Sequence, residues 1–239
     1  MTKMMELSIR LKAVADMVTP GLRLADIGTD HAYIPIYLVE NEIIPSAIAM
    51  DINKGPLNRA EANIKDHGLD QKIRTRLSDG LERLEINEAD TMIAAGMGGA
   101  LVIKILSADR TITENLKELI LQPQSEIWKV REYLCRTGYR IIDEKMVIDD
   151  EKYYTVMKAV RGEAAYNKAE LEYGPVLLER KDPVLLEFLN REKQITYTIL
   201  KSLYGQKSDK SKQRFAELTH TMSFLNQVMN DYFEGSDDE

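Results

Sequence analysis

The chain has a single cysteine, Cys135, among its 239 residues, and this scarcity excludes two kinds of architecture. One thiol can form neither an intramolecular disulfide framework nor a cysteine-rich zinc site. No apolar run approaches the roughly 20 residues that a membrane-spanning helix requires. Residues 1–10 also lack the apolar core and cleavage site of a secretory signal. We therefore expect a cytoplasmic protein that engages no membrane and no metal, and we further expect a monomer.

Positive charge is also in short supply. The 32 Lys and Arg residues are outnumbered by 39 Asp and Glu residues, and the formal net charge is −7. That balance disfavours a nucleic-acid binder held by electrostatics alone, although net charge does not describe local patches. Basic residues gather in two places, Arg74, Arg76 and Arg83, and Lys129, Arg131, Arg136 and Arg140. Composition leaves open whether these are solvated faces or a surface that contacts phosphates.

The turn after the first predicted strand lacks two of the glycines of a dinucleotide-binding loop. Gly28 is followed by Asp30 and Ala32, where the G-x-G-x-x-G pattern would have glycine. Asp30 would also place a negative charge beside a pyrophosphate. The loop therefore favours a nucleoside ligand with a cationic or amino-acid end, and it argues against a nicotinamide-dependent oxidoreductase.

Short apolar runs alternate with helical patterns as far as about residue 160, which is typical of a mostly parallel sheet wrapped by helices. The predicted strands are 22–27, 47–51, 72–77, 91–95, 116–121, 139–147 and 153–160. The predicted helices are 7–18, 32–41, 56–67, 100–106 and 125–136. A short acidic turn joins the last two strands, so these strands must be antiparallel and form a hairpin at the sheet edge.

After residue 163 the strand pattern stops, and leucines and aromatic residues recur at helical spacing. We therefore expect two domains, 1–163 and 164–239, the second an α-helical hairpin that resembles a coiled coil. Asp182-Pro183 is a strong helix start, and a second helix follows the polar break at 205–209. The predicted apolar stripe of the first helix is Leu185, Leu186, Leu189, Ile195 and Ile199. The tail 235–239 is expected to be disordered.

Four successive strand ends carry unusual residues: Asp26, Asp51, Asp79 and the glycines of 96–98. Each alone could be a turn former or a solvated strand end. In a doubly wound sheet, however, ligands bind at the carboxyl ends of the strands, near the point where strand order reverses. These four groups are therefore predicted to converge on one crevice.

The chemistry of these groups matches S-adenosylmethionine. Asp51 can accept both ribose hydroxyls, and Asp79 can accept the exocyclic amine of adenine. Either Asp26 or Asp30 can hold the ammonium, and glycines at 96–98 let the backbone approach the sulfonium closely. The predicted cofactor-binding residues are Asp26, Ile27, Gly28, Asp30, His31, Asp51, Asp79, Gly80, Gly96, Met97 and Gly98.

The same segments resemble the bacterial tRNA (adenine(22)-N1)-methyltransferases, the TrmK family. The resemblance covers nearly the whole chain and rests on residues 25–35, Gly80-Leu81, residues 93–99 and Leu121-Gln122-Pro123. It implies a class I, Rossmann-like methyltransferase fold, S-adenosylmethionine as methyl donor and tRNA as substrate. Gln124 stands where the family pattern has an asparagine after Gln-Pro.

Methylation of adenine N1 needs alignment more than proton transfer, because N1 has an in-plane lone pair and no proton. Gln122 and Gln124 can hydrogen-bond a base edge, and Tyr33 can stack on the base; these three are the predicted catalytic residues. His31 could stack there too, or could cap the following helix. Phosphate contacts are expected at Lys129–Arg136 and at the hairpin tip, where Lys207, Lys210, Lys212 and Arg214 lie. A small-molecule methyltransferase and a non-catalytic partner protein that binds S-adenosylmethionine remain alternatives.

Overall fold

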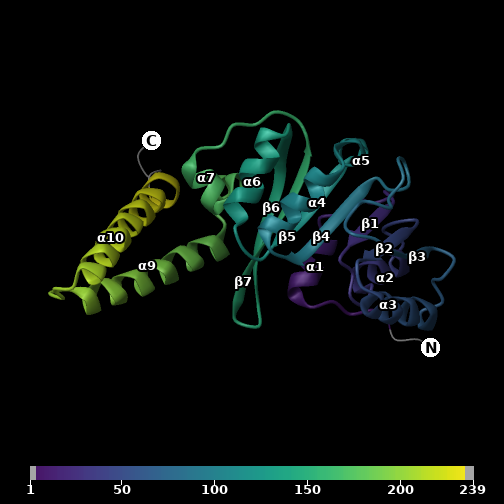
Figure 1. Cartoon of the computed structure of the whole chain (residues 1–239), viewed down its shortest axis with the longest axis horizontal. Coiled ribbons are helices and arrows are strands. Elements are labelled where there is room, and N and C mark those ends of the chain that lie inside the picture. The colour runs from purple at the N-terminus through teal and green to yellow at the C-terminus, as the bar shows by residue number, and fades with distance from the viewer. Residues whose placement is uncertain (1–3, 235–239) are drawn as a thin grey trace. The chain divides into compact units, whose positions relative to one another are not determined.

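The computed structural model describes residues 4–234. The tail 235–239, predicted to be disordered, lies outside these residues. The chain divides between Glu172 and Tyr173 into two compact units (Figure 1). The first contains the sheet and the helices around it, and the second contains a pair of long helices. Each unit is described by itself below.

Seven strands form the single sheet of the first unit, in the order β3-β2-β1-β4-β5-β7-β6 (Figure 1). The strands are β1 (Leu24–Ile27), β2 (Ala47–Asp51), β3 (Ile73–Leu77), β4 (Thr91–Met97), β5 (Glu118–Pro123), β6 (Tyr139–Asp149) and β7 (Lys152–Arg161). β1 to β5 are parallel, whereas β7 pairs antiparallel with both β5 and β6. The predicted Rossmann-like sheet and its antiparallel edge hairpin are confirmed.

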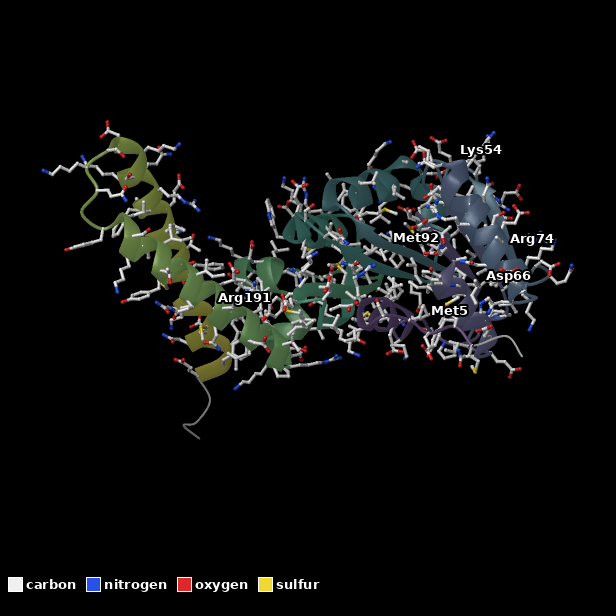
Figure 2. All side chains as sticks on the ribbon, turned by 90° about the horizontal axis from the view of Figure 1, so that it is seen from below. Met5, Lys54, Asp66, Arg74, Met92 and Arg191 are labelled. Carbon is white, nitrogen blue, oxygen red and sulfur yellow. The ribbon has the colours of Figure 1, made fainter. Side chains whose placement is uncertain are left out.

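Helices of the first unit follow the predicted alternation with strands. They are α1 (Ile9–Ala15), α2 (Tyr33–Glu40), α3 (Lys54–Asp66), α4 (Gly99–Ala108), α5 (Arg110–Asn115), α6 (Ile127–Arg136) and α7 (Lys168–Tyr173), whose last residue belongs to the second unit. Figure 2 labels Lys54 and Asp66, the two ends of α3. The sequence pattern did not predict α5, a short helix that Asp109 caps by accepting the N–H groups of Thr111 and Ile112.

One hydrophobic core joins α1, α2 and α3 to a face of the sheet. Val14, Ile36 and Ile64 of these helices are buried with Ile93 and Ile120 of the strands. Successive strand residues point to opposite faces. The buried Met92, Leu119 and Leu121 therefore face the other side, where α4 and α6 pack against each other. Because both faces are covered, the open positions for a ligand are the ends of the strands.

The second unit is a helical hairpin. It contains α8 (Pro175–Glu179), α9 (Pro183–Leu203), α10 (Asp209–Met229) and the π-helical turn η1 (Asn230–Glu234), and α9 packs against α10. Asp182 caps α9, because its carboxylate accepts the N–H groups of Val184 and Leu185, both at 2.9 Å.

The predicted apolar stripe of α9 is correct only in its first half. Leu185 and Leu189 are fully buried, but Ile195 and Ile199 are 43% and 37% exposed, and Thr196 is buried instead. Positions 185, 189 and 196 keep the spacing of the face that meets a partner helix, whereas 195 and 199 fall to one side of it. After Leu189, the buried face of α9 therefore continues through Thr196 and does not include Ile195 and Ile199.

Candidate active site

The carboxyl ends of the parallel strands bring the predicted strand-end residues together. Strand order reverses at β1, whose neighbours are β2 and β4. Asp26 of β1 pairs in register with Ala49 and Ile93, and Asp51 of β2 pairs with Leu77, two residues before Asp79. Two pockets open along this edge, and Gly28, Ala95 and Gly96 line both of them.

The first pocket, which we call the strand-end pocket, has a volume of about 370 Å³. Its lining residues are Ile27, Gly28, Asp51, Ile52, Asn53, Ser78, Asp79, Gly80, Ala95, Gly96, Met97, Leu101, Lys104 and Ile105. Asp51 accepts the backbone N–H of Asn53 at 2.7 Å, and Asp79 pairs with Lys104 at 3.3 Å. Both carboxylates are partly accessible, so each can accept further hydrogen bonds from a ligand.

The second pocket, which we call the helix-side pocket, has a volume of about 320 Å³. Its lining residues are Arg10, Leu11, Asp26, Gly28, Thr29, Asp30, His31, Ala32, Tyr33, Ile34, Ala95, Gly96 and Gln124. It therefore combines the loop after β1, the end of β4, the residue after β5 and the start of α1. The two pockets share a wall that includes Gly28, which follows β1, and Gly96, which lies within β4.

Asp26 is the most strongly perturbed acid of this edge. Its side chain is buried, and burial raises the pKa of its carboxyl group to about 6. The Thr29 side chain opposes this shift, and the charge of Asp51 adds to it. A buried carboxylate that lines a pocket without a cationic partner among the described residues suits a ligand ammonium, which would replace the lost solvation.

Two glycines let the backbone approach a ligand at the junction of the pockets. Gly28 has φ of +73°, and a β-carbon there would lie 2.2 Å from Cε of Met97. Gly96 has φ of +79° and lies at an irregularity in the β4–β5 pairing, between Ala95 and Met97. Its N–H leaves the ladder and donates instead to Oε1 of Gln122 at 3.1 Å. Any other residue would be strained at both positions.

The loop residues after Gly28 divide into two groups. Asp30 is exposed and forms an ion pair with Arg59 of α3, with Nε and Oδ1 3.0 Å apart. Since this carboxylate already has a cation, Asp26 is the better candidate for an ammonium. His31 and Tyr33 stack on each other, with ring centroids 4.8 Å apart and planes 7° from parallel. α2 has no side-chain cap, so His31 does not cap it, and the stacked pair forms part of the pocket wall.

Two predicted site residues, Gln122 and Gly98, occupy positions that differ from expectation, whereas Gln124 lies where it was expected. Gln122 is fully buried, and its Oε1 already accepts hydrogen bonds from Gly96 and Arg10, so it does not present an amide to a base. Gln124 is exposed and lines the helix-side pocket. Gly98 lines neither pocket; it precedes α4, and a β-carbon there would lie 3.2 Å from Oγ of Ser125.

Sequence reasoning missed Arg10 altogether. It belongs to α1, 112 residues before its partner Gln122, and the predicted helix 7–18 was assigned only a packing role. Local spacing contains no signal for such a contact, because the contact depends on how α1 crosses the end of β5.

Among residues 4–234, no cluster of three or more His, Cys, Asp or Glu side chains could hold a metal ion. Over the same residues, no helix is long and apolar enough to cross a membrane. The site described above therefore consists of backbone, carboxylates, amides and aromatic rings in that part of the chain.

Comparison with known proteins places this geometry in a class. A family model described as a methyltransferase domain matches residues 7–157, which include every strand-end residue discussed above. A tRNA (adenine(22)-N(1))-methyltransferase from Bacillus subtilis is 37% identical over 233 residues, covering 95% of this chain and 98% of the relative. The fold and pockets are thus those of a methyltransferase. Within that class, the chain belongs to the family of the tRNA (adenine(22)-N(1))-methyltransferases.

Solved structures of similar proteins share this fold over nearly the whole chain. A Streptococcus pneumoniae protein in complex with S-adenosyl-L-methionine superposes with a TM-score of 0.84 at 31% identity, covering 94% of this chain and all of that one. TrmK of M. capricolum, in complex with the cofactor product S-adenosyl-homocysteine, superposes with a TM-score of 0.81 at 28% identity. That match covers 95% of this chain and 99% of the other.

Proposed function

We propose that the protein transfers a methyl group from S-adenosylmethionine to N1 of the adenine at position 22 of tRNA. The observation that carries this proposal is the near full-length similarity to the Bacillus subtilis enzyme of that specificity, together with two adjoining pockets at the strand ends. A small-molecule methyltransferase would share the pockets but would have no need of the C-terminal hairpin.

The residues present fit the cofactor. In the strand-end pocket, Asp51 would accept the ribose hydroxyls, and Asp79 with Gly80 would meet the adenine edge. In the helix-side pocket, the buried Asp26 would hold the ammonium. Gly28 and Gly96, shared by both pockets, would leave space at the junction. When bound, the cofactor supplies an electrophilic methyl group on a sulfonium.

The chain's own residues then have to align and shield the acceptor base. Gln124 is placed to hydrogen-bond a base edge in the helix-side pocket, and the stacked His31 and Tyr33 offer an aromatic face to the base. N1 attacks without losing a proton, so no general base is needed. The product ring is cationic, so the site must tolerate the positive charge that develops on the base.

The hairpin has the charge pattern expected of an element that positions tRNA. Residues 191–215, the half nearest the loop between α9 and α10, carry seven Lys or Arg and only two Asp or Glu. The remainder of 164–239 carries three basic and eleven acidic residues. Exposed Tyr197 and Tyr204 lie in the basic half and could stack on bases.

We infer that residues 1–163 perform the transfer and that 164–239 position the tRNA. We further infer a monomer acting in the cytoplasm.

The test is to map the nucleoside that the purified protein makes. An unmodified tRNA transcript is incubated with methyl-labelled S-adenosylmethionine, digested and analysed by mass spectrometry. The expected product is 1-methyladenosine at position 22, absent from a matched transcript with guanine at that position. Label on another position or atom would refute the assigned site, and label confined to small molecules would favour the alternative methyltransferase.

A further inference from the structure

Three strands of the first unit hold Arg10 at the helix-side pocket, one through its backbone and two through its side chain. The backbone N–H of Arg10 donates to Oδ2 of Asp149 at the end of β6, at 3.0 Å. Its guanidinium donates through one terminal nitrogen to Oε1 of Gln122 on β5, also at 3.0 Å. The guanidinium carbon lies 5.5 Å from the ring centroid of Tyr154 on β7. The cation is therefore fixed by helix α1, the edge hairpin and β5 together.

This guanidinium has no carboxylate partner within 4.0 Å among the described residues, although it lies in a pocket that contains two acids. Asp30 is paired with Arg59, and Asp26 is buried in the wall. Of the five N–H groups of the guanidinium, one has an acceptor, the amide oxygen of Gln122. A planar donor fork with free N–H groups at a pocket wall suits a carboxylate, which it can bind through two parallel hydrogen bonds.

We propose that Arg10 binds the carboxylate of the amino-acid end of S-adenosylmethionine, while Asp26 binds the ammonium of the same group. This inference rests on the proposed function, because it assumes that this cofactor occupies the two pockets. An amino acid is a zwitterion, and the helix-side pocket presents one cation and one buried anion, neither of which forms an ion pair within 4.0 Å among the described residues. The cation does act on Asp149, whose pKa is lowered by the backbone N–H of Arg10 and by its charge. The glycine junction would let the amino-acid end pass from the strand-end pocket into this one.

The same contacts identify Gln122 as a residue that positions Arg10. Its Oε1 accepts both the N–H of Gly96 and the guanidinium of Arg10, and these two donors determine the orientation of the amide. The backbone at the junction is thereby tied to the cation in the pocket. Gln122→Glu keeps the shape and an acceptor oxygen for both donors but adds a negative charge beside Arg10. The new carboxylate would therefore compete with the ligand carboxylate.

The experiment is a calorimetric titration of the full-length protein with three ligands. S-adenosylmethionine carries both the carboxylate and the ammonium; its decarboxylated form keeps the ammonium; 5′-methylthioadenosine has neither. Arg10→Met should weaken S-adenosylmethionine binding by about 10- to 100-fold, the range for losing hydrogen bonds between charged groups. Binding of the other two ligands should change by less than about twofold, since neither has a carboxylate.

Controls separate this role from a general effect. Lys12→Met removes the same charge from the same helix at a residue paired with Asp16, and it should leave all three affinities unchanged. Gln122→Glu should reproduce the selective loss of Arg10→Met, and Arg10→Lys should give a smaller one. Melting temperatures of all variants verify folding.

Two outcomes would overturn the proposal. Equal losses for all three ligands would mean that Arg10 acts by shaping the junction through Gln122. Unchanged cofactor binding with a raised KM for tRNA would assign Arg10 to an RNA phosphate. If the wild-type protein binds none of the ligands, the proposed function itself fails, which the wild-type titration distinguishes from a failure of Arg10 alone.

Discussion

The two pockets at the sheet edge are built in contrasting ways. The strand-end pocket is lined by consecutive strand ends and by α4, and its acids, Asp51 and Asp79, remain partly accessible to water. The helix-side pocket draws on segments from Arg10 to Gln124, and it combines a buried acid with an arginine. The first suits neutral hydroxyl and amine groups. The second can bind full charges, because burial strengthens electrostatic interactions there.

The largest expected effect is that of Asp26→Asn. Removing the charge leaves a ligand ammonium unpaired in a buried position, which typically costs about 3–5 kcal/mol. S-adenosylmethionine affinity should therefore fall by at least about 100-fold, while 5′-methylthioadenosine affinity changes little. Equal losses for both ligands, measured by calorimetry, would remove the distinction between the pockets.

Asp51→Ala should weaken both ligands alike, by about 30-fold, because both contain the ribose that Asp51 would bind through charge-assisted hydrogen bonds. Glu61→Ala, an exposed acid on α3, is the matched control and should leave both affinities unchanged. A loss confined to S-adenosylmethionine would place Asp51 with the charged end of the cofactor and contradict the assignment.

Acid pH should affect the helix-side pocket selectively. The pKa of Asp26 is raised to about 6 in the folded protein, so the group is mostly protonated at pH 5 and cannot neutralise an ammonium. S-adenosylmethionine binding should weaken about tenfold between pH 7 and pH 5, because only about a tenth of Asp26 is ionised at pH 5. The dependence should disappear in Asp26→Asn.

The same raised pKa predicts a change in stability. The folded state binds the proton of Asp26 more tightly than the unfolded state, so stability from this group is present below about pH 4 and lost as the pH rises through about 6. The loss is about 3 kcal/mol. Asp26→Asn should therefore raise the melting temperature of the ligand-free protein at pH 7 but not at pH 4, as measured by calorimetry.

Gln124→Ala should lower kcat/KM for tRNA about fivefold to tenfold, the usual effect of losing one hydrogen bond. Cofactor affinity should stay unchanged, because Gln124 is assigned to the base. Gln122→Ala should instead lower cofactor affinity through Arg10. If Gln124→Ala lowered cofactor affinity and Gln122→Ala lowered only kcat/KM for tRNA, the roles assigned to the two glutamines would be wrong.

The smallest effect is expected in the hairpin of the second unit. Lys207→Gln combined with Lys210→Gln should raise the KM for tRNA about threefold and make binding less dependent on salt, with no change in cofactor affinity. Lys65→Gln with Lys72→Gln, at exposed positions of the first unit, is the charge-matched control. Equal effects of the two pairs would argue against a specific role for the hairpin tip.

The strand-end residues were predictable, and several of their neighbours were not. Asp26, Asp51 and Asp79 each follow or end an apolar run, and parallel strands necessarily bring their carboxyl ends to one edge. No local pattern shows that Gln122 points inward while Gln124 reaches a pocket. Residues two apart on a strand would face the same side, so the difference arises because β5 ends at Pro123 and the chain turns before Gln124.

The amino-acid sequence by itself determined the Rossmann-like sheet, the helical hairpin and the acids at the strand ends. These depend on hydrophobic periodicity and turn chemistry, which act over a few residues. Only the tertiary structure decided which acid is buried without a cationic partner and which is paired, since Asp30 forms an ion pair with Arg59 of α3. It also brought Arg10 to Gln122, across 112 residues. Charge pairing depends on distances in space, and spacing along the chain does not encode them.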